Sequence, residues 1–291
     1  MNTPMSLNKM DRENLAEQAT DSVVIHQIFY DSRTRLSLDP GFLPLDNTKN
    51  LKPDWREYWP IRNYILEHKL DEFTYYGFLS PKFFEKTGLS SDEVYRYLKT
   101  LPSGLDVVSF SPFFDVGAFF RNTLDHCLIQ HPNAQRAIVW ALENLCGGID
   151  LSELVMHSRI SIFCNYFIAK ASFWREWLSK CELVWSAAEG GGAEISSALN
   201  VNANGHTLNP PVKTFIVERV ASLILATQKS WNSTAYPPLK LPFSSAKISS
   251  ERDSLLSLDA LKIAYCVTGC LDYLHEHERF SRAVLTKCLK S

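Results

Sequence analysis

The chain has 291 residues, 45% of them hydrophobic and 12% aromatic, so it can bury a sizeable core. Thirty lysines and arginines against 32 aspartates and glutamates leave the net charge near zero, and no long basic run occurs, which argues against nucleic acid as a partner. No stretch of about 18 apolar residues occurs, so we expect no membrane-spanning segment. Peripheral contact with a membrane stays open.

The cysteines and the N-terminal residues predict a cytoplasmic location. The seven cysteines form no Cys-x-x-Cys pair, and we expect reduced, mostly buried thiols in a cytoplasmic protein. Residues 1–20 are polar and lack the apolar core of a secretion signal, so we expect a mobile lead-in there.

Strands and helices alternate in the pattern of the first 180 residues. β-Branched and aromatic runs predict strands at 22–31, 73–79, 105–114 and 160–170. Helical patterns fall at 56–70, after Ser90, at 117–132, at 133–148 and at 172–185. Such alternation is typical of an α/β fold with a mostly parallel sheet and helices on both faces.

The last third of the chain is predicted to be helical. A strongly apolar helix spans 212–228, a loop rich in proline and serine follows at 230–250, and the end of the chain, 254–289, has a helical pattern. We therefore expect one main domain over 21–229 and a C-terminal loop and helical extension over 230–291.

Polar residues occur at each predicted strand end. They are Gln27 and Tyr30, then Ser80 and Lys82, then Asp115, while the fourth strand contains Asn165 and ends at Lys170. Ligands of such sheets bind beyond the carboxyl ends of the strands, so these residues predict a site for a phosphorylated or nucleotide ligand. The alternative is that they simply cap the strands in turns.

The helix at 212–228 contains an isolated pair of charges. From Phe215 to Ala226 the only charged residues are Glu218 and Arg219. Burying a charge is costly unless it is paired or serves a ligand, so one of the two is expected to reach a cleft. The fork of Arg219 suits a phosphate, and a structural ion pair is the alternative.

A base that accepts a proton from a hydroxyl must be a carboxylate or histidine in the cleft. Asp46, in the long loop after the first strand, and Asp115 are candidates, and Asp125 is a third. The sequence does not choose among them.

Four stretches, in chain order, resemble segments of bacterial GT-A-like glycosyltransferases from capsule, O-antigen and exopolysaccharide clusters. They are "VVIHQIFYD", "YYGFLSPKFFEKTGL", "SIFCNYFIAKASFWREWL" and "VKTFIVERVASLIL", and together they cover about residues 22–229. The resemblance implies a nucleotide-sugar-binding glycosyltransferase domain over 21–229, working in the cytoplasm or at the inner face of the plasma membrane. The acceptor it implies is a surface glycan or a lipid-linked glycan.

The resemblance also implies roles for residues. Gln27 and Tyr30 would lie near the nucleotide; Gly77, Ser80 and Lys82 would border the donor diphosphate; Asn165 and Tyr166 would line the sugar or acceptor pocket; Glu218 and Arg219 would close the site.

The chain departs from the family in lacking the metal-binding Asp-x-Asp motif. Charge on the leaving diphosphate must still be neutralised, and Lys82 and Arg219 are the candidates, so we expect no metal cofactor although a divalent ion stays open. The missing motif also favours an alternative, a non-catalytic protein of this fold that binds a glycan or a partner. A nucleotidyl-transfer enzyme is disfavoured because its N-terminal glycine-rich signature is absent.

Overall fold

The computed structural model describes residues 22–203 and 210–290, so the predicted lead-in over 1–20 lies outside the described residues. The strands are β1 (Ser22–Phe29), β2 (Leu43–Asp46), β3 (Thr74–Leu79), β4 (Val107–Ser109), β5 (Phe167–Lys170) and β6 (Ser233–Ala235). The α-helices are α2 (Ser32–Leu36), α3 (Tyr58–Glu67), α4 (Phe83–Thr87), α5 (Ser91–Leu98), α6 (Phe114–Phe119), α7 (Thr123–Gln130), α8 (Gln135–Leu145), α9 (Ala171–Gly190), α10 (Ala193–Asn200), α11 (Val212–Thr227), α12 (Arg252–Thr268) and α13 (Leu271–Lys290). Short 3₁₀ turns are η1 (Pro53–Trp55), η2 (Pro132–Ala134), η3 (Pro238–Lys240) and η4 (Lys247–Ser250).

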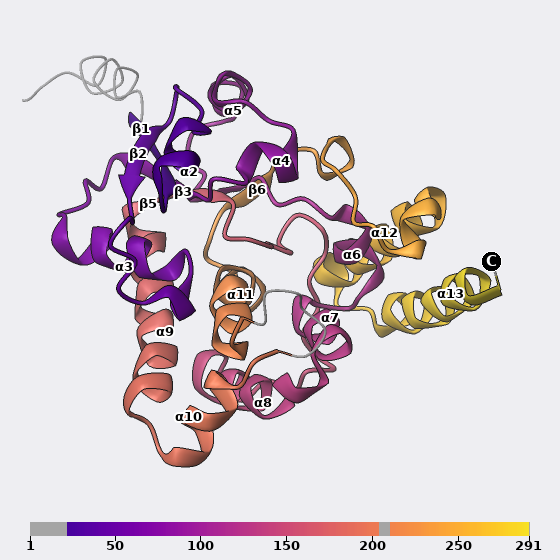
Figure 1. Cartoon of the computed structure of the whole chain (residues 1–291). Helices are drawn as coiled ribbons and strands as arrows, with labels where there is room; N and C mark the ends of the chain where they lie inside the picture. The colour runs from indigo at the N-terminus through magenta and orange to yellow at the C-terminus, as the bar shows by residue number, and fades with distance from the viewer. Residues whose placement is uncertain (1–21, 204–209, 291) are drawn as a thin grey trace, which may run out of the picture.

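The strands form one mixed sheet in the order β2-β1-β3-β5-β4-β6. β1 pairs in parallel with β2 and β3, and β4 pairs in parallel with β6. β5 is antiparallel to both of its neighbours, β3 and β4. The α/β class is therefore confirmed, with a single described strand running against the others (Figure 1).

Helices cover both faces of the sheet because successive strand residues point to opposite sides. Ile28, Tyr76 and Phe78 pack into the larger core, which α3, α8, α9 and α11 complete. Ile25, Tyr75 and Leu79 face the other way, into a core shared with α4 and α5. Figure 1 shows α9 and α11 on one side of the sheet and α4 and α5 on the other.

The direction of β5 decides which residues reach the carboxyl edge of β1, β3 and β4. The predicted strand over 160–170 is too long, because only Phe167–Lys170 is strand. Cys164 and Asn165 instead adopt left-handed backbone, with φ of 64° and 55°. Because β5 runs the other way, its beginning lies at this edge, and its last residue, Lys170, lies at the opposite edge, 3.1 Å from Asp106.

The C-terminal segment is joined to the sheet as well as to helices. β6 lies within the predicted 230–291 extension, yet it pairs with β4 and completes the sheet. Beyond it, α12 and α13 pack together against α6, away from the sheet (Figure 1). α12 and α13 form a helical hairpin, and the buried Lys262 of α12 anchors it by donating hydrogen bonds to the carbonyls of Gly117, Phe120 and Met156. Within the two described ranges, no helix combines the length and apolar character needed to cross a bilayer.

Candidate functional site at the carboxyl edge of the sheet

A buried hydrogen-bond framework joins three of the predicted site residues. The side-chain amide of Gln27 donates to the carbonyl of Ser80 at 3.3 Å, and the hydroxyls of Ser80 and Tyr166 are 2.6 Å apart. The carbonyl oxygen of the Gln27 side chain accepts from the backbone of Asp39 at 2.8 Å. The ends of β1 and β3 and the start of β5 are therefore held in one rigid arrangement.

Charged groups gather above this framework. The amine of Lys86, on α4, lies 3.1 Å from the sulfur of Cys164 and 5.9 Å from the centroid of the Tyr166 ring. Burial lowers the pKa of Lys86, but Cys164, Glu218 and Glu57 outweigh it, so its pKa is raised. Burial, followed by the negative charge of Glu218, raises the pKa of Glu57. Two carboxyl groups and one amine thus act on one another here.

Tyr30, the first residue after β1, belongs to the same group. Burial raises the pKa of its phenol, and the charge of Glu57 adds to the effect. Its backbone N–H donates to the hydroxyl of Thr34 at 2.9 Å, which fixes the turn that leaves the strand. The predicted position of Tyr30 in the site is therefore compatible with the structure.

Strained backbone is concentrated around these residues. Five described residues other than glycine have positive φ, and three of them, Arg56, Cys164 and Asn165, flank the charged group. Such conformations cost about 1–3 kcal/mol each and are concentrated at functional sites. The side chain of Asn165 is buried, and its Oδ1 accepts no hydrogen bond from the described residues. A buried acceptor without a donor is what a ligand hydroxyl or amide could complete.

Three predicted residues lie elsewhere or play another part. Asp115 is fully buried and accepts hydrogen bonds from the backbone N–H and the hydroxyl of Ser244, so it anchors a loop. Asp46 ends β2 at the same carboxyl edge, opposite Phe29 of β1, but it is exposed and accepts a hydrogen bond from the backbone of Thr48, which lowers its pKa. Gly77 is in the middle of β3, where a Cβ would come within 3.0 Å of Ile168, so its smallness serves the packing of the sheet.

Lys82 and Arg219, the two residues predicted to neutralise the donor diphosphate, differ in their surroundings. Lys82 is exposed at the start of α4, and its backbone N–H lies 3.3 Å from the Ser80 hydroxyl. Arg219 is buried and donates to the carbonyls of Thr123 at 3.1 Å and Phe215 at 2.8 Å. These bonds occupy its fork inside the protein, and its Nη1 lies 3.6 Å from a carboxylate oxygen of Glu218, so the two form an ion pair in which Glu218 keeps 28% of its side chain exposed. Of the charged pair on α11, Glu218 is the residue that faces the site.

Glu57, Lys86 and Cys164 were not singled out from the sequence. Lys86 follows Lys82 by four residues, which on a helix places both on one side, so this spacing was an available signal. Glu57 and Cys164 carry no local pattern of this kind, because each joins the group through residues far away in the sequence.

In the described part of the chain, no three histidine, cysteine, aspartate or glutamate residues are arranged to hold a metal ion. Independence from a metal stays a prediction. Comparison with known proteins adds no assignment: no family model, curated protein or solved structure matches this chain.

Proposed function

We propose that this protein is a glycosyltransferase that moves a sugar from a nucleotide-sugar donor to a bacterial surface glycan or a lipid-linked acceptor. The observation that carries the proposal is the position of the Lys86 amine, 3.1 Å from Cys164 and under the charge of Glu218 and Glu57. Beside it, the buried Oδ1 of Asn165 has no hydrogen-bond partner among the described residues. Ligands of open α/β sheets bind at this edge. We place the activity in the cytoplasm, with contact to the inner face of the membrane.

The proposed chemistry needs a base and a positive charge. The base removes the proton of the acceptor hydroxyl as that oxygen attacks the sugar carbon, and the bond to the diphosphate breaks. Glu218, with 28% of its side chain exposed, is the carboxylate that we assign to this role, while the raised pKa of Glu57 suits it to hold a proton. The amine of Lys86 would offset the charge that develops on the leaving diphosphate.

We propose Lys86 as the source of positive charge in place of Arg219, which the sequence had suggested together with Lys82. The guanidinium of Arg219 already donates to two backbone carbonyls, and turning it toward a diphosphate would leave those carbonyls without their donor. Lys82 remains the candidate at the exposed rim, and Gln27, Tyr30, Ser80, Asn165 and Tyr166 remain candidates for donor binding.

The first experiment is a thermal-shift screen with UDP, GDP, CMP and their sugars. An enzyme of this kind is expected to be stabilised by one nucleotide class. With the donor identified, Glu218→Gln is expected to lower transfer by about 10²- to 10⁴-fold, as for loss of a general base. Lys86→Met is expected to lower it by about 10²- to 10³-fold, with or without EDTA.

Lys69→Met, at an exposed position after α3, is the matched control and should keep full activity. Stabilisation by no nucleotide class, or full transfer by Lys86→Met, would overturn the proposal. Nucleotide-sugar binding without any transfer would instead support the non-catalytic alternative, which the missing Asp-x-Asp motif favours.

A further inference from the structure

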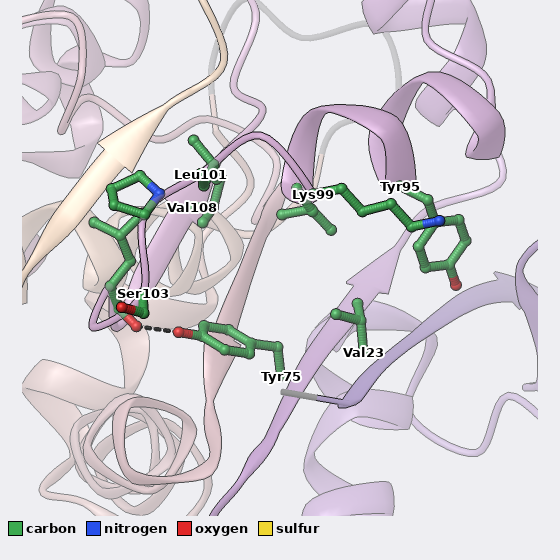
Figure 2. Close-up of a pocket in the computed structure, with 10 residues that line it drawn as sticks. Val23, Tyr75, Tyr95, Lys99, Leu101, Ser103 and Val108 are labelled. Carbon is green, nitrogen blue, oxygen red and sulfur yellow. Dashed lines mark hydrogen bonds between the residues drawn. The ribbon is translucent and has the colours of Figure 1, made fainter. Parts of the chain in front are cut away.

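A cavity of about 550 Å³ lies at the other edge of the sheet, by the amino ends of β1, β3 and β4. Its floor is formed by Val23, Tyr75 and Val108, each the second residue of its strand. Its roof is the end of α5 and the loop that follows, from Tyr95 to Leu105 (Figure 2). The volume falls within the range of about 300–1,000 Å³ that small-molecule sites occupy.

The cavity exists because the chain rises away from the sheet between α5 and β4. The capping box of Ser90 and Glu93 starts α5 firmly, but the helix ends at Leu98 and the loop at 99–106 returns to the sheet only at β4. Gly104, with φ of 87°, makes the return turn. The Tyr75 hydroxyl donates to the carbonyl of Leu105 and so braces the loop from below (Figure 2).

The lining is apolar, with one charge. Val23, Leu98, Leu101 and Leu105 form most of the wall, and each is only partly covered by the core beneath it. Lys99 is the single charged side chain among the described residues that line the cavity, and it is exposed. Figure 2 shows its chain running beside Tyr95 along the roof. An apolar ligand with an anionic end matches both features.

We propose that this cavity is a second ligand site, which binds a small amphipathic carboxylate such as a medium-chain fatty acid. The apolar chain lies against the valine and leucine walls, and the carboxylate meets the Lys99 amine at the mouth. A second cavity, of about 460 Å³ between α8 and α10, offers no such charge, because its Arg136 is already paired with Glu194 at 2.9 Å.

Calorimetric titration of the full chain with decanoate tests the proposal, with decan-1-ol and decyltrimethylammonium as matched ligands. Decanoate is expected to bind most tightly and decyltrimethylammonium most weakly, because only the carboxylate complements Lys99. Lys99→Met is expected to weaken decanoate binding by roughly 2- to 5-fold, the effect of one exposed ion pair. Lys69→Met, an exposed lysine outside the cavity, should leave it unchanged.

Two variants that fill the cavity test its location. Leu101→Trp and Ser103→Trp each place a large ring in the available volume and are expected to abolish binding; Ser103 is exposed, so that variant should fold normally. Failure of decanoate to bind the full chain, or unchanged binding by both filled variants, would overturn the proposal. Because the readout is binding at the amino edge, neither result bears on glycosyl transfer at the carboxyl edge.

Discussion

The amine of Lys86 lies 3.1 Å from the sulfur of Cys164. This contact joins α4, which follows β3, to the left-handed turn that leads into β5. Burial raises the pKa of the Cys164 thiol to about 11, while Lys86 acts in the opposite direction by favouring the thiolate. The thiol therefore reports on the lysine that we place in the candidate site.

Lys86→Met is expected to slow the alkylation of Cys164 by roughly 3- to 10-fold at pH 8–9. Without the nearby positive charge the pKa of the thiol rises further, and the reactive thiolate becomes rarer. Iodoacetamide labelling followed by peptide mass spectrometry separates Cys164 from the other cysteines. Lys82→Met, one helical turn away and exposed, is the control, and an equal slowing by both variants would contradict the assignment.

His26 is expected to make the protein sensitive to acid. Burial, with a smaller contribution from His68, lowers its pKa to about 4, and neither ring nitrogen has a hydrogen-bond partner among the described residues. In the unfolded chain His26 binds a proton below about pH 6.5, but in the folded chain it does so only below about pH 4. The protonation of His26 therefore does not lower the free energy of unfolding above about pH 6.5, and lowers it progressively as the pH falls from about 6.5 to about 4. The decrease in the free energy of unfolding that we assign to His26 is about 3 kcal/mol.

His26→Phe tests this, because the ring lies between Tyr64 and Phe78 and a phenyl group fits the same stack. Urea unfolding at pH 7, 6, 5 and 4 should show a smaller loss of stability with acid than the unmodified protein shows. His275→Phe, on an exposed position of α13, should leave the dependence unchanged. An unaltered slope in His26→Phe would exclude His26 as its source.

Lys262→Met is expected to destabilise the protein by about 3 kcal/mol. The amine donates to three backbone carbonyls, at 2.7 Å for Phe120 and 2.6 Å for Met156 besides Gly117, and removal leaves buried acceptors without donors. Denaturant unfolding gives the value. Lys287→Met, an exposed lysine paired with Glu251 on the same hairpin, should have little effect, and equal losses would argue against the buried anchor.

Asp115→Ala is expected to lower the free energy of unfolding by about 2 kcal/mol without changing nucleotide binding. Its carboxylate holds the backbone and hydroxyl of Ser244, so its loss frees a loop and leaves those donors unpaired. Asp115→Asn, which keeps one acceptor oxygen, should recover part of the stability. A stable Asp115→Ala protein that had lost nucleotide affinity would restore Asp115 to the site, where the sequence had suggested it.

Local sequence determined the elements whose signals lie within a few residues. Ser90 and Glu93 form the predicted capping box, and the β-branched and aromatic runs of β1 and β3 form strands where expected. A cap needs residues three apart and a strand needs its own alternation, so both can be recognised without the rest of the chain. The polar residues at the strand ends, Gln27 and Ser80, were recognised for the same reason, whereas Tyr166 was named only through the family resemblance.

Only the tertiary structure decided the direction of β5, the pairing of β6 with β4, and the meeting of Glu57, Lys86 and Glu218. Each depends on contacts between residues distant in the chain, whose partners no local pattern specifies. The same holds for Asp115 and Arg219, which bond to Ser244 and to Thr123. A charged residue in an apolar segment indicates that the side chain needs a partner when it is buried. Which group becomes that partner depends on how the whole chain packs.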